Sequence, residues 1–215
     1  LVRAPHYVDT KVINDLIKDK LVWLNAKIAE QSKANQQCCC FNQNDKLFVL
    51  GKLVRLNIYF AAQTDVFLVE AYQEPALHVV LAKRYQNKLN ELQHQRVAVK
   101  KQIERYFKQQ AESIIFSKVA HYSQLTQLKP INIKIRQYSA RWGSCNSRGE
   151  LSFNYLMMML PDHVIDYIVV HELCHLRFLN HSADFWQLVA RHFPRYLQAK
   201  QWLKDNHLQL LWRLP

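Results

Sequence analysis

The long stretch from Arg84 to about Tyr122 limits the fold more than any other part of the sequence, because it contains neither glycine nor proline. Apolar side chains recur along it at helical spacing, at Leu92, Val99, Ile103, Phe107, Ile114 and Val119. This periodicity without a helix breaker predicts one long amphipathic helix. The other predicted helices and strands are shorter and precede or follow it in the sequence.

Before this helix, residues 8–34 carry apolar side chains with the period of an amphipathic helix. The run "KLFVLGKLVRLNIYF" then places two apolar, β-branched segments on either side of Gly51-Lys52, which predicts a β-hairpin. Two further short strands are predicted at "DVFLVE" and "LHVVLA". We expect a boundary near Ala82 between an N-terminal α+β part, residues 1–82, and a second part, residues 83–215.

After the helix, "INIKIRQYS" alternates as a strand does, and "ELSFNYL" is a second candidate strand. Between them we predict a turn that contains Gly143 and Gly149. A further helix is predicted to begin at Pro161-Asp162, since proline is common in a first helical turn. No βαβ alternation is present, so the predicted class is α+β, with a long helix, a small mixed sheet and C-terminal helices.

Composition narrows the class of protein. Hydrophobic residues make up 49% of the sequence and charged residues 21%, as in ordinary globular proteins. No apolar run approaches the roughly 20 residues of a membrane helix, so we expect no membrane association. Five cysteines, three of them consecutive at Cys38, Cys39 and Cys40, are unsuited to a disulfide framework. We therefore expect reduced thiols and a cytoplasmic protein.

The formal charge of +12 raises the question of a nucleic-acid partner. Basic side chains gather in residues 83–108, at Lys83, Arg84, Lys88, Arg96, Lys100, Lys101, Arg105 and Lys108. The same segment has two acidic residues, Glu91 and Glu104, and interleaved aromatic residues. It is either a phosphate-binding strip or the solvated face of an amphipathic helix. We favour the solvated face.

The segment "HELCHLRFLNH", from His171 to His181, carries the chemistry. Residues four apart share one face of a helix, so His171 and His175 can bind one ion, for which zinc is the natural choice. Glu172 points to the side, where it can act as a general base on a metal-activated water. A chain with 10 histidines among 215 residues contains such a motif by chance about 0.02 times. Cys174 is expected to be a packing residue.

The third ligand is less certain from the sequence, because His181, Asp184 and Asp205 all follow the motif. We favour His181. The spacing H-E-x-x-H-x-x-x-x-x-H is that of metzincins, although Phe178 stands where they carry glycine.

The turn that returns His181 to the ion then requires two local features. Asn180 is predicted to end the first helix in a left-handed conformation. Ser182 is predicted to cap the next helix, "ADFWQLVARHF".

Over almost its whole length the chain resembles the YgjP-like metallopeptidase family, bacterial zincins related to the SprT and WLM peptidases. The motifs RWGSC…G…FN and HELxH…NHSxxFW carry the resemblance. It implies a zincin-like fold with a strand beside the active-site cleft, one zinc ion at His171, His175 and His181, and Glu172 as the catalytic base of a peptidase. The alternative is a basic nucleic-acid-associated protein, either a DNA-linked protease of the SprT or WLM type or a non-catalytic zinc-binding module.

Arg141 and Asn154 belong to the first of these motifs and are candidate substrate-binding residues. Arg141 can hold a substrate carbonyl or carboxylate, and Asn154 can orient a ligand histidine. Both also have purely structural interpretations, since asparagine readily caps the end of a strand. Neither alternative is excluded by the sequence.

Overall fold

The computed structural model describes residues 4–26, 28–29, 39–70, 74–83, 86, 92–206 and 210. Its internal contacts divide the chain into two compact units, Leu1–Cys38 and Cys39–Pro215. The first unit contains helix α1, Thr10–Asp19, whose first turn is capped by the Asp9 side chain. The amphipathic helix predicted near the N-terminus is therefore confirmed over α1, while residues 27 and 30–34 of that prediction lie outside the described residues.

The second unit begins with a four-stranded sheet. Its strands are β1 (Lys46–Val49), β2 (Lys52–Ala61), β3 (Asp65–Val69) and β4 (Ala76–Ala82), in the order β1-β2-β4-β3. β2 and β4 are parallel, and the outer pairs are antiparallel. The predicted hairpin and both further strands are confirmed. The hairpin turns at Leu50 and Gly51, which have positive φ angles of 47° and 76°.

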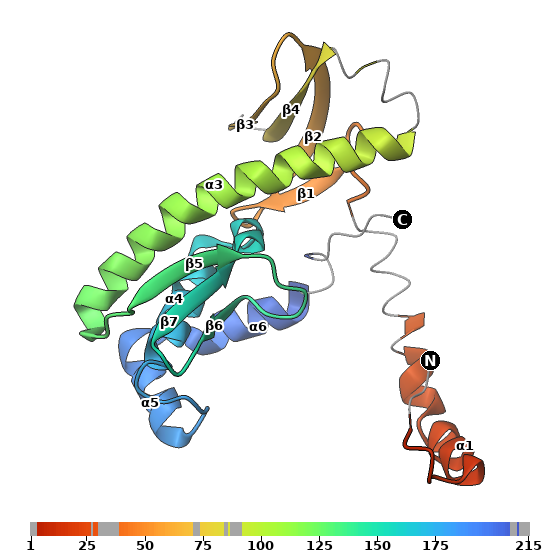
Figure 1. The fold of residues 1–215 in the computed structure, drawn as a ribbon, viewed down its shortest axis with the longest axis vertical. Helices are drawn as coiled ribbons and strands as arrows, with labels where there is room; N and C mark the ends of the chain where they lie inside the picture. Colours follow the sequence, from red (N-terminus) through yellow and green to blue (C-terminus); the bar gives the residue numbers. More distant parts are fainter. Residues whose placement is uncertain are drawn as a thin grey trace. The chain divides into compact units, whose positions relative to one another are not determined.

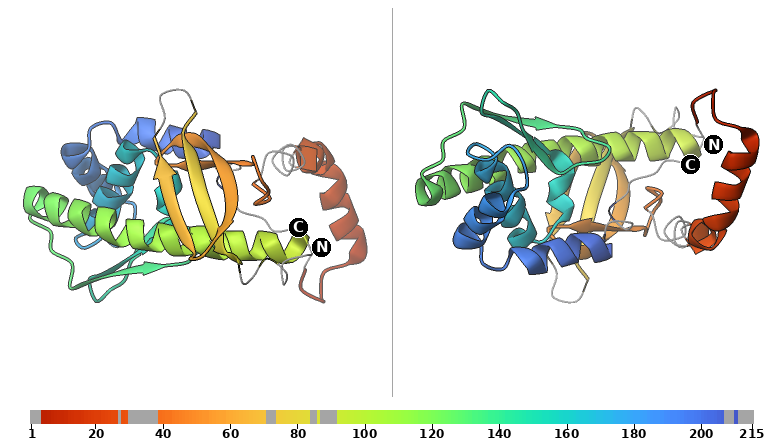
Figure 2. Two further views of the ribbon diagram at one scale, coloured as in Figure 1. Left: turned by 90° about the horizontal axis from the view of Figure 1, so that it is seen from above. Right: turned by 90° about the horizontal axis from the view of Figure 1, so that it is seen from below.

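Helix α3, Leu92–Thr126, is the long helix that the periodicity predicted. Its buried side chains recur at every fourth position: Val99, Ile103, Phe107, Ala111, Ile115, Val119 and Ser123. This stripe packs against strands of both sheets and against the helix that carries the histidines. Figure 1 shows α3 running between the two sheets, and Figure 2 shows the first sheet crossing it. α3 therefore contacts both sheets and α4 within the second unit.

A three-stranded sheet follows α3. It consists of β5 (Asn132–Arg136), β6 (Gly143–Cys145) and β7 (Glu150–Asn154), in the order β5-β7-β6. β5 is parallel to β7, whereas β6 is antiparallel to it and lies at the sheet edge. The prediction that Gly143 lies in a turn was wrong, since Gly143 begins β6. Three residues are too few for an alternating pattern to reveal a strand.

The chain ends in helices. A 3-10 helix, η2 (Tyr155–Met159), leads into α4 (Asp162–Cys174), and α5 (Ala183–His192) and α6 (Tyr196–Asn206) follow. The predicted start of α4 is confirmed, with Pro161 at its N-cap. The class is thus α+β, as predicted. Among the described residues, no helix is both long and apolar enough to cross a membrane.

The hairpin of the first sheet is hydrogen-bonded to η2 and contacts Pro161, the N-cap of α4. The backbone N–H groups of Leu50 and Gly51 donate to the carbonyls of Met158 and Met159 at 2.7 and 3.1 Å. A Cβ on Gly51 would lie 2.7 Å from Cγ of Pro161, so only glycine allows this approach. The boundary predicted near Ala82 lies inside the second unit. The division into residues 1–82 and 83–215 remains a prediction.

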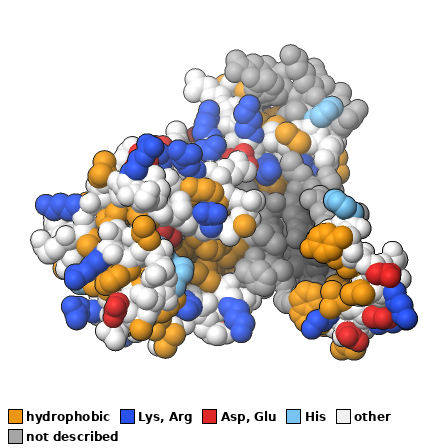
Figure 3. Space-filling model, turned by 60° about the horizontal axis from the view of Figure 1, so that its bottom comes forward, with side chains coloured by type: hydrophobic (Ala, Val, Ile, Leu, Met, Phe, Trp, Pro, Cys, Tyr) orange, Lys and Arg blue, Asp and Glu red, His pale blue; other side chains and the backbone are white. Residues whose placement is uncertain are grey.

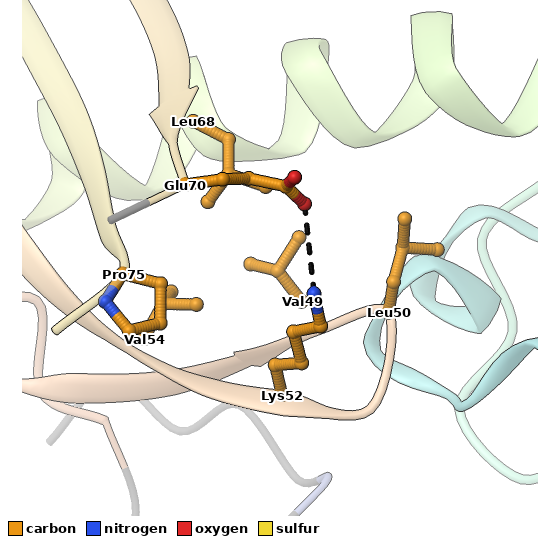
Figure 4. Close-up of a pocket in the computed structure, with 7 residues that line it drawn as sticks. All are labelled: Val49, Leu50, Lys52, Val54, Leu68, Glu70 and Pro75. Atoms are coloured by element: carbon orange, nitrogen blue, oxygen red, sulfur yellow. Dashed lines mark ion pairs between the residues drawn. The ribbon is translucent and has the colours of Figure 1, made fainter. Parts of the chain in front are cut away.

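A cavity of about 270 Å³ lies beside this hairpin. Figure 4 shows its apolar lining, which includes Val54 and Leu68, and the Lys52–Glu70 ion pair across it. Nζ of Lys52 lies 3.6 Å from the Glu70 carboxylate, and both side chains are mostly exposed. Such an exposed pair contributes little to stability.

Candidate metal centre

Three histidines meet at the end of α4. His171 lies in the last turn of the helix, His175 is its C-cap residue, and His181 lies in the connection to α5. Nε2 of His171 lies 3.2 Å from Nε2 of His175 and 3.1 Å from Nε2 of His181. Their candidate ligand atoms all lie within 4.8 Å of one another. In the described part of the chain, neither Asp184 nor Asp205 joins this cluster, so the side chains converge as His171, His175 and His181.

The turn that returns His181 differs from the prediction. Asn180 was expected to be left-handed, but the described non-glycine residues with positive φ are Phe41, Asn44, Leu50 and Gln127. Instead α4 ends at Cys174, and the Asn180 side chain accepts a hydrogen bond from the Ser182 backbone at 3.3 Å. Because Phe178 does not need positive φ either, no glycine is required there. Ser182 caps α5 as predicted, and Cys174 is fully buried.

The chemistry of the three nitrogens suits a metal ion. Nδ1 of His175 lies 2.8 Å from the Phe178 carbonyl oxygen, which can only accept, so the neutral ring carries its proton on Nδ1. This leaves a lone pair on Nε2, which lies 3.2 Å from Nε2 of His171. Nitrogens bound to one tetrahedral zinc at about 2.0–2.1 Å are separated by about 3.3 Å. The observed separations of 3.1 and 3.2 Å are close to this value.

Burial favours the neutral form of two of these rings, His171 and His175. Burial, together with the neighbouring His175 and His181, lowers the pKa of His171 to about 3. Burial likewise lowers the pKa of His175. Nδ1 of His171 is buried without a hydrogen-bond partner. Neutral imidazoles whose lone pairs face one another repel unless a cation lies between them, so the residues present fit a bound metal.

Aromatic side chains of α5 form the wall of the site. Phe185 stacks on His175, with ring centroids 4.5 Å apart, and Trp186 stacks on His181 at 5.5 Å. Tyr196 also stacks on Trp186, and Nζ of Lys200 lies 4.0 Å from the centroid of the Trp186 ring. These contacts fix the ring orientations. Sequence reasoning did not assign them a role, although the dipeptide Phe185-Trp186 belongs to the quoted motif.

Glu172 lies outside the three-histidine cluster and is 6% exposed. Its carboxyl group lies against the backbone of β6, so a Cβ on Gly143 would be 2.7 Å from Oε1. Oε2 is buried and has no hydrogen-bond partner. Burial raises the pKa of Glu172 to about 8, although the charge of Arg141 acts in the opposite direction. A buried carboxyl that can hold a proton near neutral pH is equipped for proton transfer.

The two candidate substrate residues have different environments. Arg141 is exposed, with its guanidinium 5.7 Å from the Tyr138 ring centroid. Asn154 is 3% exposed and hydrogen-bonds backbone groups, donating to the carbonyls of Tyr138 and Arg141 and accepting from the N–H of Leu156. It therefore caps η2 and holds the loop before β6, and these bonds involve no ligand histidine. A substrate-binding role for Arg141 and Asn154 remains a prediction.

The basic segment 83–108 makes several contacts within the protein. Arg96 donates to the Asn42 side chain, Lys100 lies 3.6 Å from the Glu104 carboxylate, and Lys108 lies over the Tyr155 ring. Lys101 and Arg105 are exposed, while Arg84 and Lys88 lie outside the described residues. On the face shown in Figure 3, Lys and Arg side chains lie at several separate places. Binding of nucleic acid by this segment stays a prediction.

Comparisons with known proteins bear on the identity of this centre. No curated protein matches the sequence. Among solved structures, the chain is similar to the metallopeptidase zymogens abylysin of Pyrococcus abyssi and jannalysin of Methanocaldococcus jannaschii. The first is 20% identical, covers 43% of this chain and 95% of its own length, and has a TM-score of 0.40. The second is 19% identical, covers 43% of this chain and 96% of its own length, and also has a TM-score of 0.40.

The comparison with family profiles reaches much further along the chain. The profile described as YgjP-like, metallopeptidase domain, matches residues 1–206 and so includes α3, both sheets and all three histidines. The chain therefore belongs to the YgjP-like metallopeptidase domain family.

Proposed function

We propose that this protein is a peptidase that binds one zinc ion through Nε2 of His171, His175 and His181. The observation that carries the proposal is the convergence of three imidazoles, together with the buried Glu172, which directly follows His171 and whose Oε2 has no hydrogen-bond partner. A structural zinc site is normally closed by four protein ligands. The described residues supply three ligands here, which supports a catalytic rather than a structural site.

The geometry of the site supports a specific role for each residue in the proposed reaction. Zinc, when bound, supplies a Lewis acid that acidifies water. Glu172 accepts a proton at Oε2, the carboxylate oxygen without a hydrogen-bond partner, and returns it to the amine leaving group. Phe185 and Trp186 hold the histidine rings in place. The unpaired edge of β6 offers backbone groups to an extended peptide beside Glu172.

The test combines metal analysis with a peptide-library cleavage assay on wild type and Glu172→Gln. The substitution keeps the shape of the side chain but removes its basicity. Zinc content should therefore stay near one per chain, while turnover should fall by about 10² or more. Glu112→Gln, an exposed change on α3, is the control and should retain wild-type activity.

Each unfavourable outcome has a distinct meaning. Full activity of Glu172→Gln would remove this residue from the mechanism. Zinc bound by wild type together with no cleavage of any library peptide would contradict the peptidase proposal itself.

A further inference from the structure

A second cavity, of about 260 Å³, lies between η2 and the loop that precedes β6. Its apolar walls are Tyr138, Trp142, Leu156 and Leu210, and Arg141 and Asn154 supply polar groups. We propose that this cavity is the subsite that receives a bulky apolar side chain of the peptide substrate. The inference rests on the proposed peptidase function and adds a substrate class to it.

One wall of the cavity is adjacent in sequence to the glycine that contacts the proposed catalytic group. Trp142, one of its walls, directly precedes Gly143, and the carboxyl of Glu172 lies against Gly143. A peptide that pairs with the edge of β6 therefore passes this cavity, and one of its side chains can enter it.

The walls are held in place before any substrate arrives. The backbone N–H of Asn154 donates to the Trp142 carbonyl at 2.8 Å. Its side-chain amide donates to the carbonyls of Tyr138 and Arg141 at 3.0 and 3.2 Å. One buried asparagine thus fixes three residues of the loop. A preformed pocket spends less free energy on ordering when a ligand binds.

Size and charge define the side chain that fits. Pockets for drug-sized ligands measure about 300–1,000 Å³, so a cavity of about 260 Å³ suits a single large side chain. Leu210, itself one of the walls and 2% exposed, adds aliphatic surface to the lining. Among the described residues that line the cavity, Arg141 is the charged one and none carries a carboxylate. The site should therefore accept Leu, Met or Phe and disfavour Lys and Arg.

The experiment fills the cavity without removing a wall. Ala140 lines the cavity and is exposed, so Ala140→Trp adds bulk at its mouth. The measured quantity is the ratio of kcat/KM for two peptides that differ only in carrying Leu or Gly at the preferred position. Wild type should favour Leu, and Ala140→Trp should reduce this ratio by about tenfold or more. Gln109→Trp, an exposed change on α3, is the control and should leave the ratio unchanged.

A binding measurement separates this inference from the peptidase proposal. Zinc-loaded Glu172→Gln is titrated with two fluorescent peptides that carry Leu or Lys at this position, with and without Ala140→Trp. The subsite is supported if the Leu peptide binds more tightly than the Lys peptide and Ala140→Trp abolishes this difference. This result would support the subsite even if wild type cleaves no peptide. Equal binding of both peptides, or a preference for Leu that survives Ala140→Trp, overturns it.

Discussion

Gly143 on β6 and Glu172 on α4 are in direct contact, backbone against carboxyl group. A Cβ at position 143 would lie 2.6 Å from Cγ of Glu172, 2.7 Å from Oε1 and 2.8 Å from Cδ. Real Cβ atoms do not approach other atoms so closely. The absence of a side chain at Gly143 is therefore what allows the Glu172 carboxyl to lie against β6.

This contact predicts that Gly143→Ala lowers activity without removing the metal. The added methyl group must displace the Glu172 carboxyl, and a misplacement of about 1 Å can reduce a rate by about 10². The three histidines lie on other segments and should keep their zinc. The measurements are kcat/KM and zinc content of the purified variant.

Gly149→Ala provides the matched control for that experiment. Gly149 has a φ of 76°, but a Cβ there would have no atom closer than 3.5 Å. The variant should therefore lose about 1–2 kcal/mol of stability from backbone strain alone and keep its activity per folded molecule. If Gly143→Ala proved as active as Gly149→Ala, the contact between Gly143 and the Glu172 carboxyl would not be needed for catalysis.

The metal centre predicts that His171→Ala and His175→Ala each lose bound zinc, because each removes one of three proposed ligands. His181→Ala should also bind zinc more weakly. His163→Ala, which alters an exposed histidine near the start of the same helix, should retain about one zinc per chain. The check is metal analysis after dialysis against a weak chelator. Full zinc retention by both His171→Ala and His175→Ala would contradict the proposed site.

Local patterns predicted those parts of this structure that depend on local rules. The period of α3, the hairpin at Gly51 and the Ser182 cap follow from side-chain spacing and turn chemistry, and all three were correct. β6 was missed because it has three residues and forms only by pairing with β7. The approach of Gly143 to Glu172 was missed for a related reason. It depends on how a sheet and a helix pack, which no local spacing records.

If the basic segment binds nucleic acid, reversing the charges of the exposed residues Lys101 and Arg105 should weaken that binding. Each lost phosphate contact reduces the slope of log K against log salt by about 0.7–0.9. Lys101→Glu/Arg105→Glu should therefore lower both the affinity for single-stranded and duplex DNA and the slope. Lys20→Glu, an exposed change outside the segment, is the control. If the protein does not bind DNA, or if its affinity does not change with salt, the segment is not a phosphate-binding strip and the solvated-face interpretation is supported.

Lys118 joins α3 to α4 through two aspartates. Its Nζ lies 2.7 Å from Oδ1 of Asp166 and 2.8 Å from Oδ1 of Asp162. Burial alone would lower the pKa of Lys118, but hydrogen bonds and charge from the two aspartates outweigh it and the pKa is raised. Burial, with Asp166 nearby, also raises the pKa of Tyr122 to about 12. Because folding raises both pKa values, Lys118 and Tyr122 stabilise the folded protein when they are protonated.

The last prediction is that Lys118→Met destabilises the protein in a pH-dependent way. Hydrogen bonds to charged groups contribute about 1.5–3 kcal/mol, and the largely buried Asp166 would lose its positively charged partner, so a loss of about 1–3 kcal/mol is expected at pH 7. Since the pKa of Lys118 is raised on folding, its contribution is complete below about pH 10 and is lost as the pH rises through the folded value. Urea unfolding at pH 7 and pH 11 should show the difference between wild type and variant shrinking. Lys52→Met breaks the exposed pair with Glu70 and should change stability by less than about 1 kcal/mol at either pH. A difference for Lys118→Met that stays constant across this range would mean that lost packing, rather than charge, explains it.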